Sequence, residues 1–141
     1  MTAFHYTRRV QFAETDLAGI VHFSWMFRYM EEAEHALWRA AGLSVAERGS
    51  DMGWPRVSAA FEFRNPLHFE DVVEVTVRLR DVGKRTLRYE HTLTRGTVVI
   101  GTGTMTAACV RKSDNGTMQS VDVPADIVQK LRAALSSSPG T

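Results

Sequence analysis

The stretch SWMFRYMEEAEHALWRAA, residues 24–41, decides the fold class of this chain. Its apolar residues recur at spacings of three, four and seven positions, which is typical of a helix with a buried face. Ser24 is a candidate N-cap, and Gly42 fits the left-handed position after the last turn, from which Leu43 could fold back onto Trp38. The charged residues predict a wetter side of this helix, made of Arg28, Glu31, Glu34, His35 and Arg39.

Alternation of apolar and polar residues on both sides of this stretch predicts strands. The expected strands are residues 4–12, 56–64, 72–80, 86–95 and 97–112, with a loop at 44–54 and a short second helix at 123–135. Because a single, very apolar helix can bury its faces only inside a curled sheet, this order of elements predicts an α+β fold. We expect a curved antiparallel sheet of meander-like strand pairs wrapped around one long central helix. Incomplete closure predicts that the sheet edges and the Thr-rich last strand pair with a second subunit.

Length and composition restrict the classes of function. The 141 residues predict one domain, residues 1–135, followed by a flexible tail at residues 136–141. A formal net charge of +1 argues against nucleic acid as the main partner, and no apolar run approaches the roughly 20 residues of a membrane helix. The single cysteine, Cys109, excludes a disulfide within the chain and is interpreted as a small buried residue. Since the N-terminus also has no signal-peptide pattern, we expect a cytoplasmic protein without membrane insertion.

The segment FAETDLAGIVHF, residues 12–23, places an acid among apolar residues directly ahead of the expected helix. Asp16 has two interpretations. Aspartate is common in turns, where local amides satisfy it, whereas a carboxylate at the mouth of a helix can also serve catalysis. Glu14, in the same segment, is interpreted as a solvated residue at the end of a strand.

Residues 10–33, VQFAETDLAGIVHFSWMFRYMEEA, resemble the N-terminal signature of hotdog-fold acyl-CoA thioesterases, with the 4-hydroxybenzoyl-CoA thioesterase family as the closest branch. The match consists of Thr15-Asp16, Gly19-Ile20-Val21 and the helix that follows. Downstream, NPLHFEDVVEV at residues 65–75 is similar to the family's strand entry, and the likeness extends to about residue 125. The resemblance implies a hotdog fold, hydrolysis of an acyl-CoA thioester, and Asp16 as the catalytic carboxylate.

Thioester chemistry agrees with that role for Asp16. A thioester carbonyl needs a carboxylate that attacks it or activates water, and donors aimed at its oxygen as that oxygen gains charge. A helix start supplies free N–H groups, so the amides near His22 and Phe23 are expected to bind the oxygen once a turn at Gly19 brings Asp16 close. The candidate oxyanion- and substrate-binding residues are Gly19, Ile20, Val21, His22 and Phe23, of which Ile20 and Val21 are expected to line the acyl site.

His22 departs from the family pattern, in which a histidine or an aromatic residue with a polar group often stands at the position of Phe23. A pocket role for the His22 side chain and a packed histidine with one satisfied nitrogen both remain open. Glu31 and Glu32 raise a related alternative, because another hotdog branch uses a carboxylate on the central helix. Both glutamates stand in a polar cluster of the helix, so we interpret them as ion-pairing residues.

The phosphates of coenzyme A need cations. The candidate CoA-binding residues are Lys84, Arg85, Arg88, Arg111 and Lys112. Cations at strand ends could bind the nucleotide at a subunit boundary, although a basic sheet edge that discourages aggregation explains them equally well. The sequence has no Gly-rich phosphate loop, no dinucleotide fingerprint and no metal-ligand cluster, so we expect no metal and no cofactor beyond the CoA of the substrate.

The sequence therefore predicts a metal-free acyl-CoA thioesterase that releases a free carboxylic acid and CoA and acts as a homo-oligomer, either a dimer or a tetramer. Two alternatives remain, an acyl-carrier-protein thioesterase on the same fold and a non-catalytic module that binds acyl-CoA. The acyl group, aromatic or aliphatic, is left open, and so is the choice between nucleophile and general base for Asp16.

Overall fold

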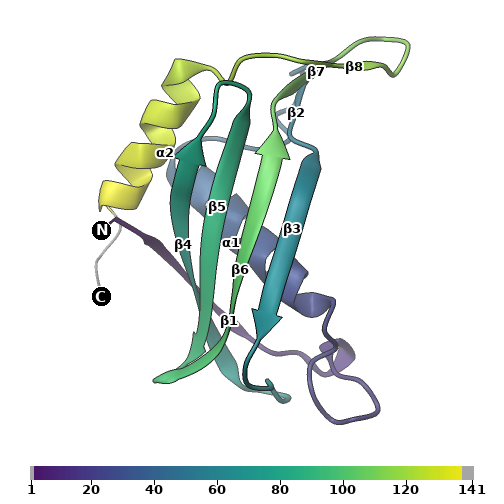
Figure 1. Cartoon of the computed structure of the whole chain (residues 1–141), viewed down its shortest axis with the longest axis vertical. Helices are drawn as coiled ribbons and strands as arrows, with labels where there is room; N and C mark the ends of the chain where they lie inside the picture. The colour runs from purple at the N-terminus through teal and green to yellow at the C-terminus, as the bar shows by residue number, and fades with distance from the viewer. Residues whose placement is uncertain (1, 138–141) are drawn as a thin grey trace.

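The structure is a computed structural model that describes residues 2–137. Its elements follow one another as a strand, a long helix, a series of strands and a final helix (Figure 1). In chain order they are β1 (Phe4–Arg9), the 3-10 helix η1 (Phe12–Glu14), α1 (Trp25–Ala40), β2 (Met52–Gly53), β3 (Arg56–Phe63), β4 (Val72–Val82), β5 (Thr86–Arg95), β6 (Val98–Ala108), β7 (Val110–Lys112), β8 (Met118–Ser120) and α2 (Ala125–Ser137).

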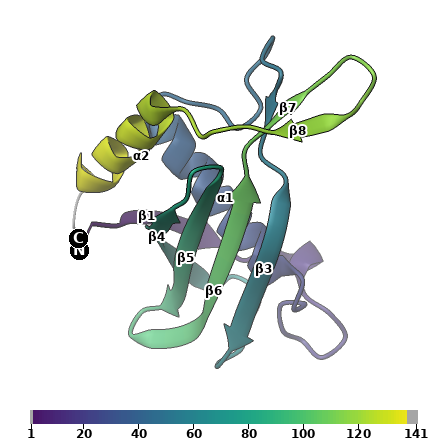
Figure 2. The same ribbon diagram turned by 45° about the horizontal axis from the view of Figure 1, so that its top comes forward.

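The main sheet has five antiparallel strands in the order β1-β4-β5-β6-β3, and it curls around α1 (Figure 1). Strands β4, β5 and β6 form a meander, while β3 lies on the far side of β6 and makes one edge of the sheet. A small second sheet, β2-β7-β8, projects from one end (Figure 2). The predicted α+β fold, an antiparallel sheet wrapped around one long helix, is confirmed.

The core lies between α1 and the concave face of the sheet. On β5, alternate residues that include Leu87, Tyr89 and Leu93 are fully buried against the helix, whereas the residues between them face the other side. The helix approaches β6 closely at Gly103, where an added Cβ would lie 2.7 Å from the sulfur of Met30. The end of the Met30 side chain therefore fills the space that a side chain at position 103 would take.

The end of α1 confirms its predicted cap. Gly42 has a φ of 78°, and the Leu43 amide donates to the Trp38 carbonyl at 2.8 Å. Ser24 stands at the N-cap position, as predicted, but its side chain makes no capping hydrogen bond. Its hydroxyl oxygen lies 2.8 Å from Nδ1 of His22 instead.

Three further expectations about the strands are corrected. The first strand ends at Arg9, and Phe12 lies in η1 with 73% of its surface exposed, because the chain turns toward α1 before reaching it. The Thr-rich strand β6 is internal, so the free edges belong to β1 and β3. The expected strand at 97–112 breaks at Cys109, which is buried as predicted.

At the C-terminus, α2 includes residues 136 and 137 of the expected tail, and residues 138–141 lie outside the described part.

A buried ion pair joins α1 to the edge strand β3. Glu34, which was expected on the wetter side of the helix, is fully buried, and both carboxylate oxygens face the guanidinium of Arg56. Burial raises the pKa of Glu34, and the charge of Arg56 opposes that shift. The correction has a physical reason, since an acid can enter a core when a cation from another element accompanies it.

Because His91 is buried, we expect the stability of the core to fall at acidic pH. Its side chain is fully buried on β5, and this burial, followed by the nearby charge of Arg56, lowers its pKa from 6.5 to about 3. Below pH 6.5 the unfolded chain takes up a proton that the folded chain excludes until about pH 3, so stability falls across that window. Between pH 7.5 and pH 5, His91 alone should lower the free energy of unfolding by about 2 kcal/mol.

Urea unfolding of the wild type and of His91→Phe at both pH values measures this loss. The phenylalanine keeps a flat ring of similar size but cannot titrate. We expect the wild type to lose about 2 kcal/mol more than the variant, and equal losses in the two proteins would contradict the assignment to His91.

Candidate active site

Asp16 lies in a closed loop between η1 and α1. The base of the loop is a bridge between Thr15 and Val21, and the Asp16 amide donates to the Ile20 carbonyl at 2.9 Å. At the tip, the Gly19 amide donates to the Asp16 carbonyl at 2.9 Å, and Gly19 has a φ of 80°. The predicted turn at Gly19 therefore exists, and glycine suits it because other residues rarely adopt this φ.

One oxygen of the Asp16 carboxylate is hydrogen-bonded, and the other is free. Oδ1 accepts a hydrogen bond from the Ala18 amide at 2.8 Å, which forms a local turn and fixes the side chain. Within residues 2–137, Oδ2 has no hydrogen-bond partner. One oxygen thus holds the carboxylate in place, while the other can act on a bound molecule.

Asp16 opens onto a pocket of about 310 Å³ between the loop, the start of α1 and the chain after β3. Its lining residues are Asp16, Ile20, Val21, Phe23, Met26, Phe63, Arg64, Asn65 and Pro66. The Phe23 amide has no hydrogen-bond partner in the described part of the chain, and it stands just ahead of the first turn of α1. A free donor at a helix start favours negative charge, so two residues that line this pocket carry a free carboxylate oxygen and a free amide.

The structure separates the predicted site residues into two groups. Ile20, Val21 and Phe23 share the pocket with Asp16, whereas Gly19 and His22 are not among its lining residues. The His22 amide donates to the Glu14 carbonyl at 2.8 Å, so it is not available to an oxyanion. The His22 ring is exposed and lies 4.6 Å from the Phe23 ring, between centroids.

The predicted CoA cations lie far from Asp16 within the chain. They stand at and beyond the β4–β5 turn and on β7, whereas the Asp16 loop lies at the opposite end of the sheet (Figure 1). Two of them are paired, Arg85 with Asp122 at 3.1 Å and Arg111 with Asp51 at 3.2 Å.

One wall of the pocket was not predicted from the sequence. Phe63, Arg64 and Asn65 reach it because β3 ends there, and the Asn65 side-chain amide fixes the turn by donating to the Val99 carbonyl at 2.7 Å. The Asn65-Pro66 pair was a visible turn signal, but its position beside Asp16 depends on the pairing of β3 with β6.

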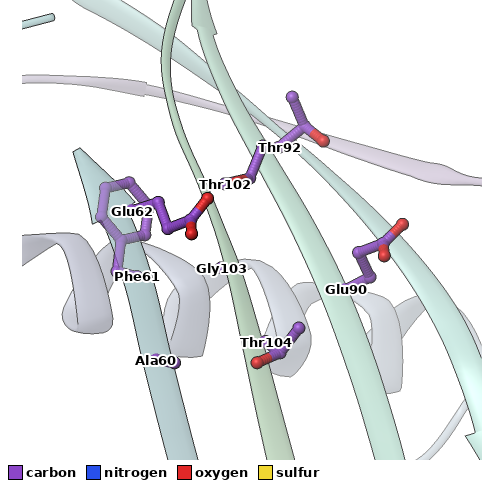
Figure 3. Close-up of a pocket in the computed structure, with 8 residues that line it drawn as sticks. All are labelled: Ala60, Phe61, Glu62, Glu90, Thr92, Thr102, Gly103 and Thr104. Carbon is purple, nitrogen blue, oxygen red and sulfur yellow. The ribbon is translucent and has the colours of Figure 1, made fainter. Parts of the chain in front are cut away.

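A larger hollow, of about 400 Å³, lies on β3, β5 and β6. In Figure 3 its glutamate and threonine side chains project from the strands with the ribbon of α1 behind the sheet, so they belong to the convex face. One of its acids, Glu90, is paired with Arg80 at 2.6 Å. Because this hollow contains neither Asp16 nor a helix start, we assign the site to the smaller pocket.

Residues 10–131 match the family model of the thioesterase-like superfamily. The chain belongs to this superfamily. A protein of Aquifex aeolicus (strain VF5), provisionally assigned as an esterase, is 34% identical over 131 residues, which are 92% of this chain and 98% of that protein. A 1,4-dihydroxy-2-naphthoyl-CoA hydrolase of Synechococcus elongatus is 25% identical over 113 residues, 78% of this chain and 83% of that protein. The solved structure of a gentisyl-coenzyme A thioesterase aligns with a TM-score of 0.80 at 26% identity and covers 90% of this chain and 98% of that chain.

Membership of the thioesterase-like superfamily confirms the predicted hotdog fold and the predicted enzyme class, an acyl-CoA thioester hydrolase. Within residues 2–137, no helix of this thioesterase-like protein is long and apolar enough to cross a membrane.

Proposed function

We propose that this chain hydrolyses a hydroxyaryl-CoA thioester, with Asp16 as the catalytic carboxylate and the Phe23 amide as the oxyanion donor. One observation carries the proposal: the free carboxylate oxygen and the free amide belong to residues that line the same pocket. The reaction adds water across the thioester C–S bond and yields a carboxylic acid and the CoA thiol. Asp16 either takes a proton from that water or attacks the carbonyl carbon itself, and the amide stabilises the negative oxygen in both cases.

The aromatic character of the pocket supports the proposed acyl group. Phe23 and Phe63 line it from two elements, and they are 61% and 53% exposed, so their faces are available to a flat ring. Two of the relatives bear the names of hydrolases for hydroxylated aromatic acyl-CoA thioesters. Because Asp16 and an amide supply the chemistry, we also propose that the enzyme needs no metal ion, so prolonged dialysis against EDTA should leave its activity unchanged.

We propose that the enzyme is a cytoplasmic homodimer or larger assembly joined through β3, with residues 1–135 as a single domain. Strand β3 is a sheet edge, and its apolar residue Val57 is 61% exposed. Leu17 of the Asp16 loop is fully exposed as well. A second copy that pairs with this edge would extend the sheet and cover these side chains.

Antiparallel pairing of two β3 strands would place the start of the partner's strand beside the end of this one. The cations Arg111 and Lys112 lie beyond the start of β3, on a strand that pairs with β2. They would therefore approach the pocket of the other subunit, where Arg64 already lines the wall. We propose that these cations bind the phosphates of CoA, in which case thioesters of pantetheine should show a raised KM.

Release of free thiol from a panel of thioesters tests the function. The panel contains short aliphatic, benzoyl and hydroxybenzoyl thioesters of CoA, and the same hydroxybenzoyl group on pantetheine and on acyl carrier protein. We expect the highest kcat/KM with hydroxybenzoyl-CoA. A higher kcat/KM with the carrier protein would favour the alternative substrate, and tight binding of CoA thioesters without turnover would favour a binding module.

The substitution Val57→Asp should break the proposed dimer, because it places a charge in the apolar contact along β3. Val98→Asp is the matched control, since Val98 is also an exposed valine but stands at the start of β6, away from this edge. Light scattering measures the mass of each protein. We expect a halved mass for the first variant alone, and a monomeric wild type would refute the assembly.

A further inference from the structure

Glu14 is almost completely buried, in contrast to its interpretation as a solvated residue. Only 3% of its surface is exposed, although it stands two residues before the exposed Asp16. Its Oε1 accepts hydrogen bonds from the Tyr29 hydroxyl at 2.6 Å, from Arg8 at 2.9 Å and from the Gln11 amide at 3.0 Å. This carboxylate therefore joins strand β1, the turn η1 and helix α1 at one point.

Tyr29 and Arg8, the side-chain partners of Glu14, each keep a fixed protonation state. Burial raises the pKa of Tyr29, and the hydrogen bond to Glu14 raises it further, so the phenol remains a donor. Burial alone would lower the pKa of Arg8, but its hydrogen bonds to Glu32 and Glu14 raise it overall. The Arg8 guanidinium also lies 5.0 Å from the centre of the Tyr29 ring, which fixes the two side chains relative to each other.

The backbone of Glu14 holds the base of the Asp16 loop. Its carbonyl accepts the His22 amide at 2.8 Å, and the adjacent pair, Thr15 and Val21, forms the bridge that closes the loop. Residue 14 thus lies two positions before Asp16, and its backbone partner lies one position before Phe23. A shift of Glu14 would move the carboxylate and the oxyanion donor relative to each other.

We infer that Glu14, held by Tyr29 and Arg8, is a positioning residue that sets the geometry between the Asp16 carboxylate and the Phe23 amide. The inference rests on the proposed function, since it assumes that Asp16 and Phe23 act on the thioester. Glu14, Tyr29 and Arg8 are not among the residues that line the pocket, so their effect must pass through the loop.

Loss of this anchor should lower kcat more than it changes KM. Displacement of a catalytic group by about 1 Å can reduce the rate roughly 10²-fold, whereas the pocket walls that hold the substrate keep their own contacts. Tyr29→Phe removes one hydroxyl and leaves the other bonds of Glu14 in place. We therefore expect kcat to fall roughly tenfold and KM to stay within about twofold of the wild-type value.

Tyr6→Phe is a matched control from the same cluster. The Tyr6 hydroxyl donates to Glu32 at 3.0 Å, so this variant also loses one bond between a tyrosine and a carboxylate, but none to the loop. We expect its kcat to remain at the wild-type value. The kcat of Glu14→Gln should fall further than that of Tyr29→Phe, roughly 10²-fold below the wild-type value. The reason is that the side-chain amide of glutamine cannot accept hydrogen bonds equally from Arg8 and Tyr29.

The experiment measures kcat, KM and Tm for the wild type, Tyr29→Phe, Tyr6→Phe, Glu14→Gln and Asp16→Asn, with all assays well below the lowest Tm. A reduced kcat in Tyr29→Phe but not in Tyr6→Phe, at nearly unchanged KM, supports the inference. If both tyrosine variants lose Tm but keep their kcat, the cluster is only structural and the inference is overturned. Full activity in Asp16→Asn would instead overturn the proposed function, so the two failures are distinguishable.

Discussion

Replacing Asp16 with asparagine should reduce kcat for the best acyl-CoA substrate by roughly 10²- to 10⁴-fold, the contribution expected of a positioned acid–base group. The substitution should change the fold very little. An asparagine oxygen can still accept the hydrogen bond that the Ala18 amide gives to Oδ1, and residue 16 is exposed. KM and Tm should therefore stay close to their wild-type values while turnover is lost.

Asp114→Asn is the control for a general loss of negative charge, because Asp114 is an exposed residue in the turn between β7 and β8. Thiol release under saturating substrate, together with the oligomeric mass of each variant, measures the effect. Asp16→Asn with a normal kcat would show that the carboxylate is not the catalytic group. A low kcat with a changed mass would show that the loop serves assembly instead.

Local patterns were enough to predict the fold because its core depends on them. The spacing of apolar residues fixed α1 within a residue at each end, since that face must meet the sheet along its whole length. Strand β5 was predicted with its bounds for the same reason. The order of the strands was harder to predict from the sequence, because the alternation in β3 does not tell whether this strand pairs with β4 or with β6.

The buried acids show what a sequence pattern cannot predict. Glu14 and Glu34 look like solvated residues, since an isolated charge in a core costs several kcal/mol. Their cations, Arg8 and Arg56, come from strands at the two edges of the sheet, and Arg56 stands 22 positions after its acid in the chain. Only the three-dimensional arrangement reveals these pairs.

For a related reason, only part of the candidate site could be predicted from the sequence. The Asp16 loop and the start of α1 are one continuous segment, so spacing alone could place the acid near a helix terminus. The wall made by Phe63 and Arg64 comes from the end of β3, and its position follows from pairing with β6.

Replacing Arg56 with methionine should lower the free energy of unfolding by about 3–5 kcal/mol, the cost of leaving a buried charge without its partner. Glu34 has no exposed surface, and its pKa is already raised by burial. Without Arg56 that pKa should rise further above its value in the unfolded chain. A raised folded pKa gives full stability below the unfolded pKa and loses it as the pH rises, so the variant should be least stable at high pH.

Two further variants make this prediction specific. Glu34→Gln combined with Arg56→Met removes both charges, and it should recover most of the lost stability because no buried ion remains. Arg80→Met is the matched surface control: its pair with Glu90 has an N–O distance of 2.6 Å, but Arg80 is 60% exposed, so the loss should stay below about 1 kcal/mol. Urea unfolding at pH 5 and pH 8 measures all four proteins. If Arg56→Met costs no more than Arg80→Met, or if the double variant is as unstable as the single one, the stability of this fold does not depend on neutralising Glu34.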